Sequence, residues 1–146
     1  MRILLINTSD RTGGAAVAAN RLLKALQKTG VSANMLVRDK ITQDTSVVSI
    51  NTSAAKKLIN RIRFVWERLV IFLCNHLSKE NLFQVSIANT GTDIRHYALV
   101  READVIHIHW INQGMLSLSD IKRLIDSGKP VVWTLHDMWP ATGVCH

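Results

Sequence analysis

Two titratable residues, His136 and Asp137, directly follow the mainly apolar run 131–135. Imidazole and carboxylate groups can move protons, bind a metal ion or hydrogen-bond a hydroxyl group of a ligand. In an open parallel α/β sheet, ligands bind outside the carboxyl ends of the strands. If the run 131–135 is such a strand, both residues lie where a substrate arrives, and we predict the chemistry there.

A second pair of imidazoles, His107 and His109, alternates along the apolar run 105–110. Alternate residues of a strand point to the same face, so the two rings are expected on one side of a strand. Trp110 closes the run, and Asn112 lies in the loop behind it. Because parallel strands end at one edge of the sheet, these side chains are predicted to share the edge of the first pair.

A glycine loop completes the predicted edge. The apolar N-terminal run 2–7 is followed by a loop that ends in Gly13 and Gly14, and a helical pattern then runs to Gly30. A strand, a glycine turn and a helix start place backbone N–H groups where a diphosphate could bind. The spacing is not that of a dinucleotide-binding motif or a P-loop, so the glycines could equally serve a tight turn alone.

The rest of the chain alternates in the same way. Strands are predicted at 32–37, 47–50 and 83–87, and helices at 53–77, at a short segment ending near Glu102, and at 118–127, where Ser117 and Asp120 form a capping box. This alternation predicts an α/β fold with a doubly wound, Rossmann-like parallel sheet, and residues 1–146 as one domain. The sequence after Pro140 is loop-like, which we interpret as the end of one half of a larger protein.

Composition and charge narrow the function classes. The chain has 146 residues, 47% hydrophobic and 20% charged, as expected for one globular domain. The first apolar run is too short for a secretory signal, and two cysteines make no disulfide framework, so we expect a cytoplasmic protein. The formal net charge of +7 favours an anionic partner. We expect no nucleic-acid binding, because the excess charge is concentrated in one helix without a known motif.

That helix, residues 54–77, is amphipathic and basic. Between residues 54 and 80 there are six basic residues and two acidic ones. Its apolar side carries Ala55, Leu58, Ile62, Val65, Leu69 and Leu73, and its polar side carries Lys56, Asn60, Arg63 and Glu67. It is either a domain helix with a solvated basic face or a helix that lies on an anionic membrane, at its inner face. The apolar segment 70–74 favours burial between packed elements.

The predicted edge is open to two kinds of chemistry. The ligand-type side chains His107, His109, His136, Asp137, Cys145 and His146 could build the metal site of a hydrolase. Alternatively, His136 works without metal and hydrogen-bonds or polarises a sugar hydroxyl, while Asp137 positions the imidazole or the loop. The indoles of Trp110 and Trp139 offer flat faces on which a sugar ring can stack.

Three motifs together resemble the N-terminal domain of bacterial family 4 glycosyltransferases, which have the GT-B fold. They are residues 7–16 (NTSDRTGGAA), 103–112 (ADVIHIHWIN) and 130–146 (PVVWTLHDMWPATGVCH). The likeness runs over nearly the whole chain and is least distinctive from about residue 38 to residue 90. It is strongest to the branch that builds cell-surface polysaccharides.

The resemblance implies a retaining enzyme that transfers a sugar from a nucleotide-sugar donor to a glycan or lipid-linked acceptor, with no metal and no further cofactor. It implies that Gly13 and Gly14 contact the donor diphosphate and that His136 is catalytic, near the transferred sugar. The residues expected on the acceptor side are His109, Trp110, Asn112 and Asp137. The C-terminal domain with the main nucleotide-sugar site lies outside residues 1–146, so these residues alone are expected to be inactive.

Two other functions stay open at this point. One is a non-catalytic module that binds a nucleotide or a glycan at the same edge. The other is a metal-dependent hydrolase that uses His107, His109 and His136. Loss of function with retained binding in a His136→Ala variant would favour catalysis, and unchanged function would favour a binding module.

Overall fold

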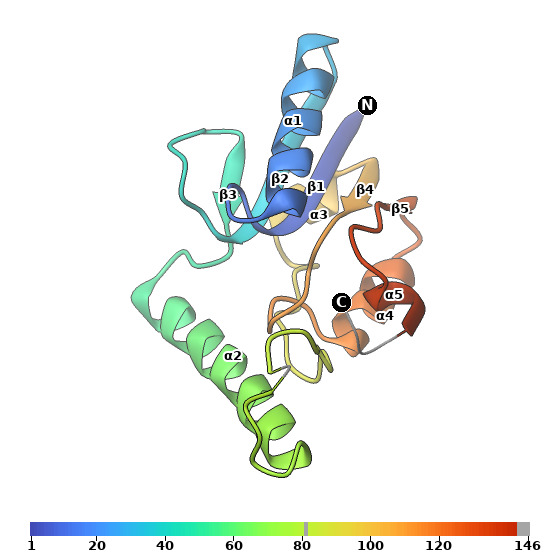
Figure 1. The fold of residues 1–146 in the computed structure, drawn as a ribbon. Helices are drawn as coiled ribbons and strands as arrows, with labels where there is room; N and C mark the ends of the chain where they lie inside the picture. The colour runs from blue at the N-terminus through green and yellow to red at the C-terminus, as the bar shows by residue number, and fades with distance from the viewer. Residues whose placement is uncertain (81, 143–146) are drawn as a thin grey trace.

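The computed structural model describes residues 1–80 and 82–142. Its centre is a five-stranded sheet in which all neighbouring strands run parallel (Figure 1). In spatial order the strands are β3 (Val47–Ser49), β2 (Ser32–Asp39), β1 (Arg2–Ser9), β4 (Val105–Ile108) and β5 (Val131–Trp133). Strands β2 and β3 therefore extend the sheet on one side of β1, and β4 and β5 then extend it on the other side.

The central strand β1 is apolar on both faces, as a strand covered from both sides requires. Leu4, Leu5 and Ile6 are each at most 2% exposed. Successive side chains of a strand point to opposite faces, so Leu5 packs in one hydrophobic cluster while Leu4 and Ile6 pack in another. The sheet thus separates two cores.

Helices cover the two faces of the sheet. Helix α1 (Gly14–Lys28) packs Leu23 into the core on one face. Helices α3 (Ala98–Glu102) and α4 (Leu118–Ile125) belong to the other face, where Val100 is part of the core. The chain therefore has the doubly wound, Rossmann-like α/β fold that the sequence predicts.

The capping box of α4 is confirmed. The Ser117 hydroxyl accepts a hydrogen bond from the backbone N–H of Asp120 at 3.1 Å, and the Asp120 carboxylate accepts one from the backbone N–H of Ser117 at 3.0 Å. These two bonds satisfy donors that the first helical turn leaves without partners. The helix start is therefore fixed by local sequence.

The predicted strand at 83–87 is wrong. Residues 82–84 form turns, and only Val85 makes an isolated bridge. The reason is that side chains form hydrogen bonds with the backbone groups that would otherwise pair with a neighbouring strand. The Arg68 guanidinium donates to the carbonyl of Val85 at 2.9 Å, and the Glu67 carboxylate accepts from the backbone N–H of Ile87 at 2.9 Å.

The end of the described chain also differs from the prediction. Strand β5 ends at Trp133 instead of Leu135, so His136 lies further into the loop behind the strand than predicted. A short helix, α5 (Trp139–Thr142), replaces the predicted loop. Trp139 anchors it, because its indole is 3% exposed and donates to the carbonyl of Ser86 at 2.8 Å.

Helix α2 (Ala54–Cys74) lies beyond the carboxyl edge of the sheet (Figure 1). Its basic residues Lys56, Lys57 and Arg61 are exposed, as a solvated basic face requires. The expectation that its apolar side is buried is wrong, because the buried side carries Asn60, Glu67 and Arg68. Within 70–74, which the sequence placed between packed elements, only Ile71 is buried. Among residues 1–80 and 82–142, no helix combines the length and hydropathy needed to span a bilayer.

Candidate functional site

Side chains from β1 hold the carboxyl end of β4 in place. Asn7 Oδ1 accepts a hydrogen bond from the backbone N–H of Trp110 at 2.8 Å, and the Asn7 amide donates to the Ser9 carbonyl at 2.5 Å. The Thr8 hydroxyl lies 3.0 Å from the Trp110 carbonyl oxygen and 3.3 Å from that of Asn112. Asn7, Thr8 and Asn112 are buried. These bonds fix the backbone around Trp110 relative to β1.

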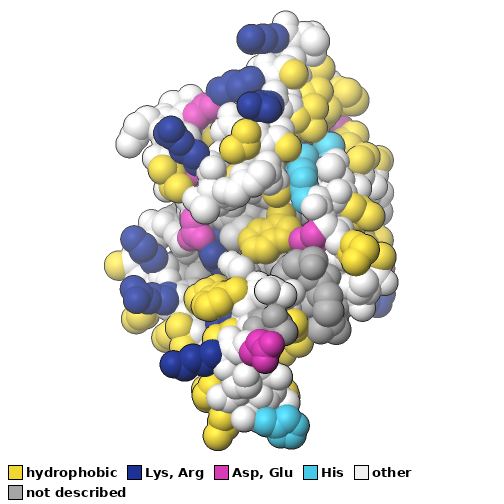
Figure 2. Space-filling model, viewed as in Figure 1, with side chains coloured by type: hydrophobic (Ala, Val, Ile, Leu, Met, Phe, Trp, Pro, Cys, Tyr) yellow, Lys and Arg dark blue, Asp and Glu magenta, His cyan; other side chains and the backbone are white. Residues whose placement is uncertain are grey.

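Three imidazoles lie in a row where β4 and β5 end, and Figure 2 shows histidine side chains gathered at the surface over β4. The rings of His107 and His109 are stacked with centroids 4.4 Å apart, and those of His109 and His136 are stacked at 5.2 Å. His109 Nδ1 lies 2.9 Å from His136 Nε2, and His107 Nε2 lies 2.7 Å from the Thr134 hydroxyl. The structure therefore brings together the two predicted site histidines.

The three rings differ in their contact with solvent. His109 is only 4% exposed, His107 is half-buried, and His136 is exposed. A ligand at the carboxyl edge would therefore reach His136 first, with His109 behind it. His107 points to the same face of the sheet as its register partner Leu5, the face that α1 covers further along the sheet.

Burial sets the protonation of the inner rings. The pKa of His109 is lowered to about 4, mainly by burial, and the neighbouring His107 and His136 contribute in the same direction. Burial also lowers the pKa of His107, and the nearby His136 acts in the same direction. His107 and His109 are therefore neutral imidazoles near pH 7.

A neutral His109 shares one hydrogen atom with His136 across their N···N contact. Whichever ring donates, the other accepts, and the outward nitrogen of His136 takes the complementary role. The second ring nitrogen of His109, Nε2, is buried and has no hydrogen-bond partner within residues 1–80 and 82–142. The pair can thus present either a donor or an acceptor to a hydroxyl group, as a general acid or base must.

Asp137 holds the loop that carries the exposed imidazole. Its carboxylate accepts a hydrogen bond from the Trp110 indole N–H at 2.8 Å and another from the backbone N–H of Trp139 at 3.0 Å. The Trp133 indole adds a bond to the His109 carbonyl oxygen at 3.1 Å. Asp137 therefore ties the loop after β5 to the end of β4, which is the loop-positioning role expected of it.

The glycine loop has the geometry of a tight turn that opens to solvent. Gly13 precedes α1 with φ +88°, in the left-handed region that favours glycine, and no side chain caps the helix start. A Cβ atom at Gly13 or Gly14 would meet nothing within 4 Å. The space beside both glycines at the start of α1 is therefore open, as approach by an anion would require.

Sequence reasoning missed the carboxylate that orders this loop. Asp10 is 1% exposed and accepts hydrogen bonds from the backbone N–H groups of Ile41 at 2.8 Å and Thr42 at 2.9 Å. Burial alone would raise the pKa of Asp10, but the bonds from Thr42 and Ile41 outweigh it, so the pKa lies below its ordinary value. The only available signal was the parallel pairing of β1 with β2, which brings the two loops together.

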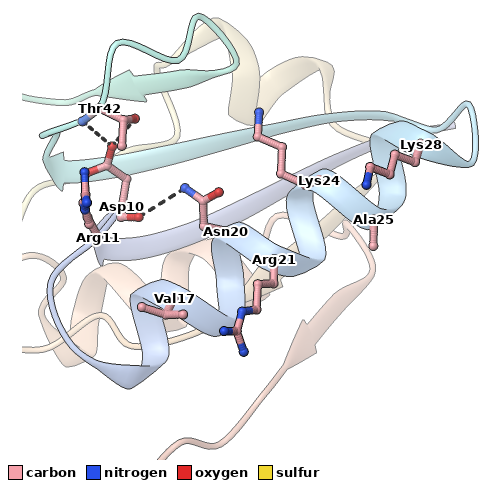
Figure 3. Close-up of a pocket in the computed structure, with 9 residues that line it drawn as sticks. All are labelled: Asp10, Arg11, Val17, Asn20, Arg21, Lys24, Ala25, Lys28 and Thr42. Carbon is pink, nitrogen blue, oxygen red and sulfur yellow. Dashed lines mark hydrogen bonds between the residues drawn. The ribbon is translucent and has the colours of Figure 1, made fainter.

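A basic cavity of about 530 Å³ lies beside this carboxylate, between α1 and the loop that contains Thr42 (Figure 3). Its basic lining residues are Arg11, Arg21, Lys24 and Lys28. Lys24 forms an ion pair with Asp44. None of the predicted site residues lines this cavity, so it is separate from the histidine row.

The described residues give no support for a metal site, and the comparisons with known proteins identify no family. In the part of the chain that the structure describes, no three His, Cys, Asp or Glu side chains are arranged to hold a metal ion. Cys145 and His146, the other ligand candidates, lie outside the described residues. No protein-family model, curated protein or solved structure matches the chain. Its function must therefore be inferred from the chemistry of its own residues.

Proposed function

We propose that this chain is the acceptor-side half of a cytoplasmic, retaining glycosyltransferase that takes a sugar from a nucleotide-sugar donor and passes it to a glycan or lipid-linked acceptor. This is the activity that the sequence resemblance implies, in the branch that builds surface polysaccharides. The Rossmann-like fold is compatible with it, since GT-B halves are Rossmann-like. A second domain would supply the main nucleotide-sugar site.

One observation carries the proposal, namely the His109–His136 pair beside the point where the winding of the sheet reverses. The chain leaves β1 for β2 on one side and pairs β1 with β4 on the other. Such a reversal opens a crevice outside the strand ends, where open α/β sheets bind ligands. Asn7 and Thr8 from β1 and the histidines after β4 and β5 border this point.

The residues would divide the work as follows. His136, the exposed ring, would hydrogen-bond a hydroxyl of the transferred sugar, and His109 would hold His136 in orientation through the 2.9 Å contact. The N–H groups behind Gly13 and Gly14 would approach the donor diphosphate, because a helix start carries partial positive charge. Trp110, Asn112 and Asp137 would border the acceptor, in the group of acceptor-side residues that also includes His109.

The test is release of nucleoside diphosphate from a panel of nucleotide sugars by this chain joined to its second domain. Release should depend on one donor, and His136→Ala should lower it by about a hundredfold or more, a usual size for losing an active-site group. His96→Ala is the matched control, because His96 is an exposed histidine outside the edge. Residues 1–146 alone should release nothing.

The alternatives predict different results. A binding module without catalysis would retain a ligand but release no nucleoside diphosphate from any donor, and His136→Ala would not change its function. Equal activity of the His136→Ala and His96→Ala variants would remove His136 from the active site. Transfer by residues 1–146 alone would refute the need for a second domain.

A further inference from the structure

Helix α2 presents a continuous apolar stripe to solvent. Seven large apolar side chains of α2 are each between 43% and 59% exposed: Leu58, Ile59, Ile62, Val65, Trp66, Leu69 and Leu73. Their spacing of three and four residues places them on one face of the helix. An exposed apolar face of this length marks an interaction surface. We call these seven residues the α2 stripe.

The outward orientation of the stripe is fixed by polar contacts on the opposite face. Glu67 is fully buried and accepts hydrogen bonds from Ser86 at 2.7 Å and from two backbone N–H groups. Arg68, 6% exposed, lies 3.3 Å from the Glu67 carboxylate and donates to the carbonyl oxygens of Leu82 and Val85. Turning the stripe inward would break all these bonds and leave two charges without partners.

The charges around the stripe have one sign. Lys56, Lys57 and Arg61 are exposed on the first two turns of α2. Glu67 is the only acidic residue of α2, and it is buried against the protein. The exposed surface of the helix is therefore apolar and basic, and Figure 2 shows apolar and basic side chains together over α2.

A recess at the edge of the stripe is suited to a phosphate group. This cavity of about 190 Å³ is lined by Arg38, Lys57, Arg61 and Phe64, among others. Asp39 is its only acidic lining residue, and it is already paired with Arg38 at 2.7 Å. Two cations, Lys57 and Arg61, therefore face the recess beside an apolar surface.

We propose that α2 lies flat in the interface of an anionic lipid membrane, with the α2 stripe in the acyl region and Lys57 and Arg61 against lipid phosphates. An apolar face with basic flanks is the pattern of interfacial helices. A second copy of the chain fits less well, since a symmetric contact through α2 would join two apolar and basic surfaces, and α2 has no exposed acidic side chain to pair with Lys57 or Arg61. This inference does not depend on the proposed transferase activity.

The first experiment measures binding of the 146-residue chain to vesicles of phosphatidylglycerol and phosphatidylcholine, compared with vesicles of phosphatidylcholine alone. The chain should sediment with the anionic vesicles. Ile62→Asp with Leu69→Asp should weaken binding about tenfold or more, because two apolar side chains no longer enter the membrane. Trp66 fluorescence should shift to the blue on binding, and a Trp66→Phe variant should lack the shift.

A matched pair of charge variants separates docking through α2 from general attraction of a basic protein. Lys57→Glu with Arg61→Glu should weaken binding about tenfold or more. Arg21→Glu with Lys28→Glu changes the net charge equally, on α1, and should weaken binding less than about threefold. All four sites are exposed, so circular dichroism should show unchanged folding.

Three results would overturn the proposal. One is absence of binding to anionic vesicles by the unaltered chain. Another is equal loss of binding in the two charge variants, which would mean attraction without docking. The third is a dimer in sedimentation equilibrium that the aspartate substitutions at Ile62 and Leu69 abolish, which would make the stripe a protein interface.

Discussion

Acidification should destabilise this protein through one buried imidazole. The pKa of His109 is lowered to about 4 in the folded chain, because burial disfavours its charged form, whereas a histidine in an unfolded chain titrates near about 6.5. Between these values the unfolded chain binds a proton that the folded chain excludes. The folded pKa is the lower one, so this stability is complete above about pH 6.5 and is lost as the pH falls toward 4.

The expected size follows from the two pKa values. Going from pH 7 to pH 5 should cost about 2 kcal/mol of unfolding free energy through His109, since one pKa unit corresponds to about 1.4 kcal/mol. Urea unfolding at both pH values measures it, with His109→Gln as the variant that removes the titrating group and keeps a hydrogen-bonding side chain. The unaltered chain should lose about 2 kcal/mol more than His109→Gln, and His96→Gln should behave like the unaltered chain. Equal losses in the unaltered chain and His109→Gln would refute the reasoning.

Two further substitutions test the fold around the site and the helix, each by urea unfolding at pH 7. Glu67→Gln should cost about 3 kcal/mol or more, because the buried Arg68 loses its counter-charge, while Glu102→Gln, at an exposed carboxylate, should change stability by less than about 0.5 kcal/mol. Gly13→Ala should cost about 1 kcal/mol or more through backbone strain alone, since its φ is +88° and its surroundings are open. Gly14→Ala has the same open surroundings without that φ, so a similar loss there would contradict the strain explanation.

The fold could be predicted because its signals are local. The apolar run from Leu4 to Ile6 is buried on both faces and lies in the central strand, and the capping box at Ser117 needs only residues three positions apart. The strand at 83–87 could not be excluded in the same way. Its backbone groups bind Glu67 and Arg68, which lie on another element, and no local pattern reveals such partners.

The site could be predicted only in part, because some of its contacts join residues on different elements. The two-residue spacing of His107 and His109 places both rings on one side of a strand, which the stacked rings confirm. Their contact with His136 depends on the register of β4 against β5, in which Ile108 is opposite Trp133. The sequence of either strand alone does not determine this register. Helical periodicity likewise gave the two faces of α2 but not the face that is buried.

The positions of α2 and the histidine edge connect the two proposals. Helix α2 lies beyond the edge at which the strands end, the edge that also carries His136 (Figure 1). If the α2 stripe lies in a membrane, this edge is held close to the lipid surface, where a lipid-linked acceptor would present its sugar. The acceptor would then be concentrated by attachment to the same surface, which raises encounter without any new contact to the active site. A soluble glycan acceptor would gain nothing from membrane docking. The aspartate substitutions at Ile62 and Leu69 should therefore lower transferase activity on vesicle-bound acceptors and leave activity on soluble acceptors unchanged. That result would join both proposals in one mechanism.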